Sequence, residues 1–132
     1  MEPARLDAMP LFADLNGEER EEVAGFLREV NVDAGTELAS EGKHAYELFL
    51  IESGDAEVTK GGETVRTLSE GDFFGEIALL ATGTRTASVV ATTPMRLVVM
   101  FSRGFKQIER RMPAVAQKLR ETMRRRVEQT SF

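Results

Sequence analysis

The sequence contains no cysteine and no tryptophan, and it has a single histidine, His44. Without cysteine the chain can form neither a disulfide nor a thiolate-based zinc site or nucleophile. One histidine excludes a metal centre built from several histidines, and a catalytic triad would have to use His44. His44 follows a glycine in a loop-like stretch, where a solvated histidine is the simpler interpretation. We therefore expect neither an enzyme nor a metal site.

Long apolar runs are also absent. None exceeds about five residues, as in Leu97–Phe101, whereas a membrane-spanning helix needs about 20. The first ten residues carry charges and no continuous apolar core, which argues against a secretory signal. These features predict a cytoplasmic protein without a membrane span, and 132 residues suffice for one domain.

Charged residues are distributed unevenly along the chain. Up to Phe101 there are 8 basic and 19 acidic residues, and after it 9 basic and 3 acidic. The run Arg124–Arg126 has the charge to contact nucleic acid or anionic lipid, but the acidic body opposes this and no aromatic residues interleave with it. A solvated basic helix end is the simpler interpretation, so we expect no direct nucleic-acid binding by this chain.

Helical periodicity is confined to the two ends of the chain. Residues 17–30 predict one amphipathic helix, opened by a capping-box pattern of Asn16 and Glu19. Its apolar residues at helical spacing are Val23, Phe26, Leu27 and Val30. Residues 102–129 predict two further helices divided by Pro113, which is well placed to open the second.

Glycines divide the middle of the chain into segments too short for long helices. Leu48–Ile51 suits a strand covered on both faces, and Asp55–Thr59 alternates as a half-exposed strand does. About eight short strands are expected, which predicts a mainly β fold with flanking helices, an eight-stranded antiparallel jelly-roll barrel. The expected layout is one domain, 1–132, with N-terminal helices in 1–30, the barrel in 31–101 and C-terminal hinge and lid helices in 102–129.

The segment Phe73–Ala91, FFGEIALLATGTRTASVVA, combines a glycine-led turn with a very short apolar helix. Gly75 lets a ligand approach the backbone closely. The N–H groups of Ile77, Ala78 and Leu79, at the start of that helix, are expected to be free and to point toward negative charge. The pattern is that of an anion site.

Two charged residues of this segment refine the chemistry. The guanidinium of Arg85 suits the two exocyclic oxygens of a phosphodiester. The Glu76 carboxylate would be repelled by a phosphate, so a sugar hydroxyl is its natural partner. One anion and one hydroxyl indicate a ribose phosphate. Taken singly, Glu76 is equally well a charge at a helix start and Arg85 a surface strand residue.

The run Phe74-Gly75-Glu76-Ile77-Ala78-Leu79, followed by Arg85, resembles the phosphate-binding cassette of the cyclic nucleotide-binding domain family. The family pattern is F-G-E-[IL]-[AS]-L followed by R-[AST]-[AST]. The resemblance extends to residues 46–54, to the turn at 70–72 and to the closing helices. Thr84 departs from it, because many members have proline before the arginine.

The resemblance implies roles for individual residues. Glu76 would bind the ribose 2′-hydroxyl, and Arg85 the cyclic phosphate, helped by the backbone N–H groups of Ala78 and Thr86. The Thr86 hydroxyl would contact the phosphate or a guanine edge, although an ordinary strand threonine is as good an interpretation. Val58 faces inward by alternation and would wall the base, but core packing explains it equally well.

The last helix is expected to act as a lid. Catabolite activators and cyclic-nucleotide-gated potassium channels of bacteria, which the chain resembles, carry a base-contacting arginine at the position of Arg126. Arg126 and Met123 would then close over the base, and simple solvation is the alternative for Arg126. Thr130 and Ser131 match polar base contacts of the activators only.

These expectations combine into a sensor that binds a cyclic purine nucleotide and moves its C-terminal helix. Cyclic AMP is favoured over cyclic GMP because the likeness is to bacterial members, and the output partner is an unidentified protein. The chain ends near where an activator would begin its DNA-binding region, so an effector fragment of a larger regulator or channel is one alternative. The others are a protein-interaction module with an empty pocket, a metal-dependent jelly-roll enzyme and a polyanion binder.

Overall fold

The computed structural model describes residues 1–80 and 83–130, with the backbone alone for Ile77 and residues 126–130. The helical elements are η1 (Pro3–Ala8), η2 (Pro10–Phe12), α1 (Gly17–Ala24), α2 (Ile77–Leu80), α3 (Ser102–Arg111) and α4 (Pro113–Thr130). The strands are β1 (Leu27–Val32), β2 (Glu37–Ala39), β3 (Glu47–Ser53), β4 (Ala56–Lys60), β5 (Glu63–Leu68), β6 (Phe73–Phe74), β7 (Ser88–Ala91) and β8 (Met95–Phe101).

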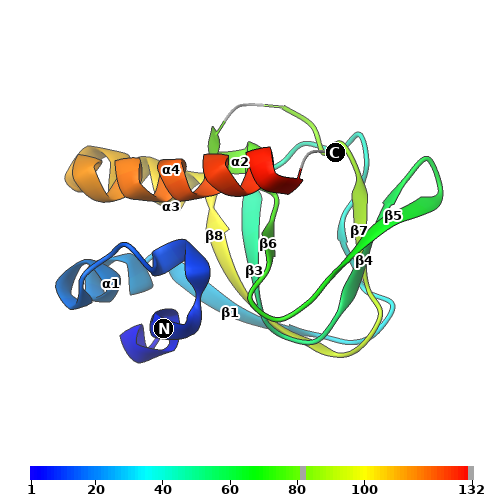
Figure 1. The fold of residues 1–132 in the computed structure, drawn as a ribbon, viewed down its shortest axis with the longest axis horizontal. Helices are drawn as coiled ribbons and strands as arrows, with labels where there is room; N and C mark the ends of the chain where they lie inside the picture. The colour runs from blue at the N-terminus through cyan, green and yellow to red at the C-terminus, as the bar shows by residue number, and fades with distance from the viewer. Residues whose placement is uncertain (81–82, 131–132) are drawn as a thin grey trace.

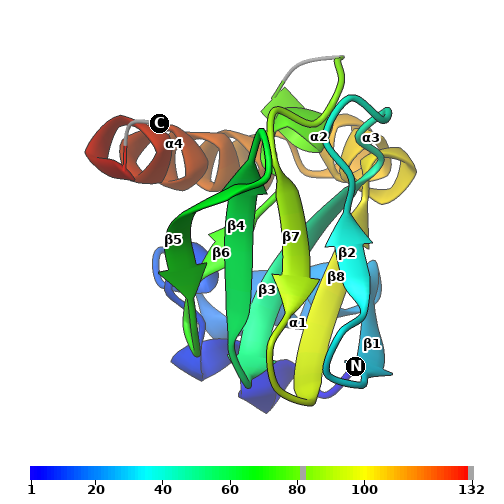
Figure 2. The same cartoon turned by 90° about the vertical axis from the view of Figure 1, so that its right-hand side faces the viewer.

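The strands form two antiparallel four-stranded sheets, ordered β1-β8-β3-β6 and β2-β7-β4-β5. Figure 2 shows the second sheet in front of the first, and Figure 1 shows helices on the other side of the first. Eight antiparallel strands with flanking helices are thus confirmed, but within the described residues the sheets do not join into a closed barrel. The edge strands β2 and β6 have only three and two residues, so few backbone groups are available to pair across the gap. The architecture is a double-sheet sandwich of the jelly-roll kind.

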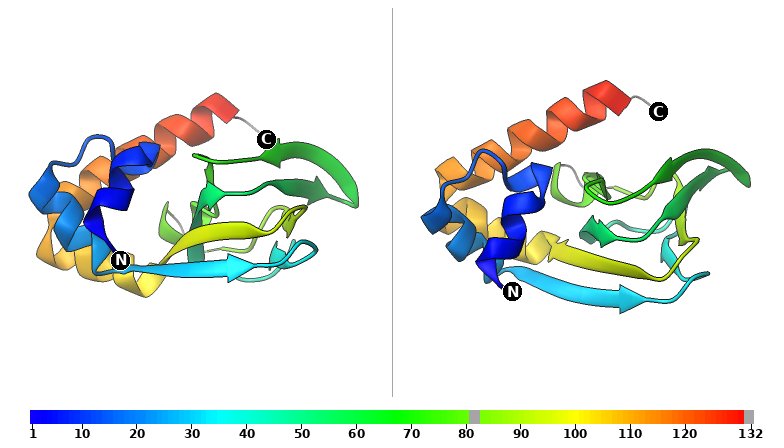
Figure 3. Two further views of the ribbon diagram at one scale, coloured as in Figure 1. Left: turned by 90° about the horizontal axis from the view of Figure 1, so that it is seen from below. Right: turned by 60° about the horizontal axis from the view of Figure 1, so that its bottom comes forward.

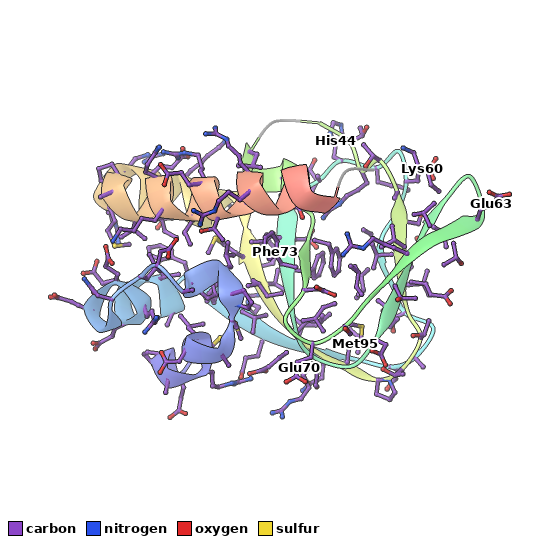
Figure 4. The ribbon with its side chains drawn as sticks, in the orientation of Figure 1. His44, Lys60, Glu63, Glu70, Phe73 and Met95 are labelled. Atoms are coloured by element: carbon purple, nitrogen blue, oxygen red, sulfur yellow. The ribbon has the colours of Figure 1, made fainter. Side chains whose placement is uncertain are left out.

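Two apolar clusters lie on opposite faces of the first sheet. Side chains alternate along β3, so Phe49 and Ile51 lie between the sheets while Leu48 and Leu50 face the helices. Figure 3 shows the helices gathered on one side of the strands, and Figure 4 shows Phe73 between the strands and α4. The first sheet is therefore covered on both faces, as its continuous apolar sequence predicts.

The predicted helix over 17–30 is wrong in its second half. α1 ends at Ala24, and residues from Leu27 onward form β1. Gly25 is a poor helix residue, and β1 pairs along its whole length with β8, for example Leu27 with Met100. The helical spacing of four apolar residues was outweighed by this long-range pairing.

The start of α1 has the predicted capping box. The Asn16 side chain accepts from the Glu19 N–H, and the Glu19 carboxylate accepts from the Asn16 N–H, both at 2.9 Å. Lys118 of α4 also bonds Glu19, at 3.0 Å. The backbone bond from Asn16 and the Lys118 ammonium hold the pKa of Glu19 below its usual value. The Glu19 carboxylate therefore links α1, near the N-terminus, to α4, near the C-terminus.

The C-terminal helices follow the predicted pattern. Pro113 opens α4, where its missing N–H costs nothing, and Phe105 and Ile108 of α3 are buried. Among the described residues, no helix has the combination of length and apolar character needed to cross a bilayer.

Candidate functional site

Two short segments, 42–45 and 83–85, run antiparallel and hold the backbone of Arg85. The Arg85 N–H donates to the Lys43 carbonyl at 2.7 Å, and the Arg85 carbonyl accepts from the Gly42 N–H at 2.9 Å. With both of its backbone groups bonded to one neighbouring segment, Arg85 is fixed in register although it lies outside the named strands. The segment before β3 thus positions the cation of the cassette.

His44 lies in the middle of this paired segment, in an isolated β-bridge with Thr84. Its side chain is exposed, and its ring centroid is 6.0 Å from that of Tyr46. Figure 4 shows it on the rim, at the opposite end of the strands from Met95. The interpretation as a solvated loop histidine is confirmed. Among the described residues, no group of three or more histidines and carboxylates is arranged to hold a metal ion.

The Arg85 side chain turns inward, and only 7% of the residue is exposed. Its Nη2 donates to the Glu47 carbonyl at 3.0 Å, and its guanidinium carbon lies 5.9 Å from the centroid of the Phe49 ring. The other terminal nitrogen, Nη1, is buried and has no hydrogen-bond partner among the described residues. A buried charged donor without a partner is costly, by about 1–3 kcal/mol or more. The expectation that Arg85 is an ordinary surface residue is therefore excluded.

Burial and two neighbouring carboxylates have opposite effects on the charge of Arg85. Burial lowers the pKa of its guanidinium, while the carboxylates of Glu47 and Glu76 act in the opposite direction. Glu76 is half-buried and close enough for this electrostatic effect. The cassette thus brings together one buried cation and one partly accessible carboxylate. Their predicted contacts with a phosphate and a ribose hydroxyl stay predictions.

The Gly75 backbone is approached closely by Arg85, whereas the sequence pattern predicts a ligand there. Its φ is +88°, and a Cβ there would lie 2.5 Å from Arg85 Nη1 and 2.6 Å from the Glu47 carbonyl oxygen. The backbone of Gly75 is therefore approached by Arg85 itself. Only glycine combines this left-handed conformation with so close a contact.

The N–H groups at the start of α2 are largely occupied. Ala78 donates to the Gly75 carbonyl at 3.0 Å, and Leu79 donates to the Glu76 carbonyl at 2.9 Å. The prediction that both are free for an anion is wrong in this conformation, because the single turn of α2 closes on the residues before it. Of Ile77 only the backbone is described. Of the groups predicted to meet an anion, the Arg85 guanidinium retains a buried donor, Nη1, without a partner among the described residues.

Val58 faces inward as alternation along β4 predicts, whereas Thr86 lies in a bend before β7 and is therefore not an ordinary strand residue. Thr86 is exposed, and Val58 is 5% exposed in the cluster between the sheets, which also holds Phe49 and Phe74. The rings of Phe49 and Phe74 stack at a centroid distance of 4.9 Å. Packing accounts for Val58, and contacts of Thr86 and Val58 with a ligand stay predictions.

The residues expected to form a lid are only partly described. Met123 is fully buried in the cluster between the helices and the first sheet, so in this conformation it is a packing residue. The side chains of Arg126 and Thr130 lie outside the described residues, as does Ser131. Leu79 and Leu80 of α2 pack against the same cluster as Met123. The cassette helix and α4 therefore border one apolar cluster, and α3 contacts both of them.

Glu47 is the site residue that sequence reasoning missed. Its carbonyl holds Arg85 Nη2, and its carboxylate influences the pKa of that guanidinium. No pattern in the sequence reveals a main-chain acceptor, because the contact joins β3 to a loop 38 residues later. The only hint was the position of Glu47 at the start of the apolar strand run.

Comparison with known proteins gives concordant matches. Residues 29–111 match the family described as Cyclic nucleotide-binding domain. A cAMP-dependent protein kinase regulatory subunit of Yarrowia lipolytica is 40% identical over 105 residues, 78% of this chain and 28% of the relative. The structure of cAMP-bound PfPKA-R has a TM-score of 0.83 at 26% identity, covering 98% of this chain and 43% of that one. The catabolite activator protein of Thermus thermophilus has a TM-score of 0.79 at 30% identity, covering 92% and 59%.

The matches also bear on how much of its relatives the chain covers and on its expected bacterial origin. The chain spans about a quarter of the length of the curated relatives, at 28%, 23% and 27% of the first three. Those relatives are fungal regulatory subunits, so the expectation of a bacterial protein is not supported. The expectation rested on an overall likeness to bacterial members, and a likeness that fungal relatives share does not indicate origin.

Proposed function

The chain belongs to the cyclic nucleotide-binding domain family, and on that premise we propose that it is a regulatory domain that binds cyclic AMP in preference to cyclic GMP. It acts as a cytoplasmic sensor that catalyses no reaction. Arg85 binds the cyclic phosphate, and Glu76 accepts a hydrogen bond from the ribose 2′-hydroxyl. The output partner is a protein, and it responds to the position of α4.

The unpartnered Nη1 of Arg85 carries this proposal. A cation that is 7% exposed, with one terminal nitrogen bonded to a carbonyl and the other to no described group, is prepared for an anion. A phosphodiester offers two exocyclic oxygens to a planar guanidinium and supplies the acceptor that Nη1 lacks. The half-buried Glu76 nearby then selects a ligand with a hydroxyl beside its phosphate.

Signal transfer would run through the apolar cluster that α2 and α4 both border, with α3 in contact with each. Leu79 and Leu80 of the cassette helix lie against the cluster that contains Leu119 and Met123 of α4. A ligand that draws in Arg85 and the cassette changes the surface on which α4 rests. The nucleotide thereby shifts the population between α4 positions, by as much as its affinity differs between them.

Calorimetric titration with cyclic AMP, cyclic GMP and linear AMP tests the proposal. Cyclic AMP should bind most tightly and linear AMP weakly. Arg85→Ala should weaken cyclic AMP binding by roughly 2–5 kcal/mol, the usual effect of removing one partner of a buried charge pair. Arg96→Ala is the matched control, because Arg96 is an exposed arginine on β8. Absence of heat with all three nucleotides would leave a protein-interaction module as the function.

A further inference from the structure

The exposed face of α3 carries a row of cations that the nucleotide site does not use. Arg103, Lys106 and Arg110 are all exposed, and Arg111 lies beside them. The spacings of three and four residues place the first three on one side of the helix, opposite the buried Phe105 and Ile108. We call Arg103, Lys106 and Arg110 the basic stripe.

The basic stripe has no acidic partner within the described part of the chain. Cations of the neighbouring helix α4 differ in this respect, because each of three bonds an acidic group of another element. Lys118 bonds Glu19 at 3.0 Å, Arg120 bonds Glu109 at 2.8 Å and Arg125 bonds Asp14 at 3.1 Å. The charge of α4 is thus partly compensated within the fold, and that of the stripe is not.

Two of the three charges of the stripe, those of Arg103 and Lys106, oppose the stability of α3. Arg103 lies in the first turn, which contains no acidic residue, and a cation there is unfavourable because the helix N-terminus is positive. Like charges three and four residues apart, as in Lys106 with Arg103 and Arg110, repel one another. The helix dipole accounts for Arg110 and Arg111 in the last turn but not for the other two. Selection for helix stability therefore does not explain the stripe.

We propose that the basic stripe of α3 docks a short acidic segment of a protein partner. The stripe extends about 10 Å from Arg103 to Arg110, given the rise of a helix, which matches two or three carboxylates on a helix or strand. A duplex or a membrane surface is less suited, because it would also approach the body of the domain, where acidic residues outnumber basic ones. Of the large apolar side chains exposed in the described residues, only Phe101 borders α3, and its ring is covered by the Arg28 guanidinium at 5.6 Å, so α3 offers little to insert into lipid.

The position of α3 suits such a partner. α3 contacts both the cassette helix α2 and the last helix α4. A segment docked on α3 therefore lies against the helix that connects α2 with α4. That the docked protein is the output partner rests on the proposed function. The docking of an acidic segment does not depend on the proposed function, so it is tested on the protein without nucleotide.

The test measures fluorescence anisotropy of a labelled peptide of about 14 residues in which glutamates recur at spacings of three and four. The stripe variant, Lys106→Glu/Arg110→Glu, reverses two of the three charges of the stripe. Lys60→Glu/Arg96→Glu is the control, since both are exposed cations on strands and the change in net charge is the same. The parent and the control should bind alike, within about threefold, whereas the stripe variant should bind at least tenfold more weakly.

Two further arms compare the peptide with a lipid surface and with nucleic acid. Phosphatidylserine-containing vesicles and a DNA duplex replace the peptide, and preferential binding of either, lost in the stripe variant, would overturn the proposal. So would equal weakening by both variants, or no peptide binding by the parent. Arg103→Gln/Lys106→Gln removes the two cations that the helix dipole does not stabilise and relieves their repulsion. It should therefore melt no lower than the parent while also losing the peptide, which separates docking from misfolding.

Discussion

Replacing Gly75 by alanine tests whether this glycine exists to accommodate Arg85. At φ +88° an added Cβ would lie 2.6 Å from the Glu47 carbonyl oxygen and 2.5 Å from Arg85 Nη1. The carbonyl belongs to β3 and cannot easily retreat, so the backbone at residue 75 must move away from it. The guanidinium must also leave, which breaks its bond to Glu47. Gly71 has the same conformation, φ +92°, but nothing within 4 Å of an added Cβ.

The two substitutions therefore share one effect and differ in another. Both introduce an alanine into the left-handed region, which costs roughly 1–2 kcal/mol. Gly75→Ala adds overpacking, typically about 1–3 kcal/mol. The free energy of unfolding should fall by about 1–2 kcal/mol in Gly71→Ala and by about 2–5 kcal/mol in Gly75→Ala.

Urea denaturation followed by circular dichroism measures the difference, and titration with cyclic AMP completes the test. Gly71→Ala should bind as the parent does, because the turn it occupies lies outside the cassette. Gly75→Ala should bind at least tenfold more weakly, since its Arg85 is displaced. If the two variants were equally stable and bound equally well, the close approach of Arg85 to Gly75 would not matter, and the reasoning would be refuted.

Other predictions concern the ribose, the last helix and acid stability. Glu76→Gln should weaken the natural ligand by roughly 1.5–3 kcal/mol in calorimetry but leave its 2′-deoxy analogue nearly unaffected; a parent that binds both ligands equally contradicts the ribose contact. Ending the chain after Arg120 removes the buried Met123, so the melting temperature should fall, and stopped-flow displacement should show dissociation faster by about one to three decades; an unchanged off-rate in a cooperatively folded protein argues against a lid. The lowered pKa of Glu19 contributes stability above its usual value of 4.5 that is lost as the pH falls through the folded pKa. Glu19→Gln should therefore show a shallower loss of unfolding free energy in that acid range, and identical acid profiles would contradict this.

Local patterns in the sequence were sufficient for much of the fold. The capping box of Asn16 and Glu19 and the start of α4 at Pro113 depend on residues within one turn of each other, so they can be read from a short window. The covered strand at Leu48–Ile51 is equally local, because its run of apolar residues indicates that both faces are buried. The sequence also indicated that Glu76 and Arg85 belong to one site, since both are part of one continuous motif.

Features that depend on distant residues were not predictable in this way. Residues after Gly25 have helical spacing but form β1, because their hydrogen bonds to β8 satisfy the backbone over six paired positions. The division into two sheets likewise depends on how short edge strands meet, which no local pattern encodes.

The state of the site was decided by tertiary structure alone. The sequence determined that an arginine and a glutamate share a glycine-led cassette, and hence the chemistry available to a ligand. Folding determined that Arg85 is buried against Gly75 and held by the Glu47 carbonyl, with Nη1 left without a described partner. The reason is that burial and main-chain acceptors arise only when β3 and residues 83–85 are brought together, whereas charge and residue type are already present in the unfolded chain.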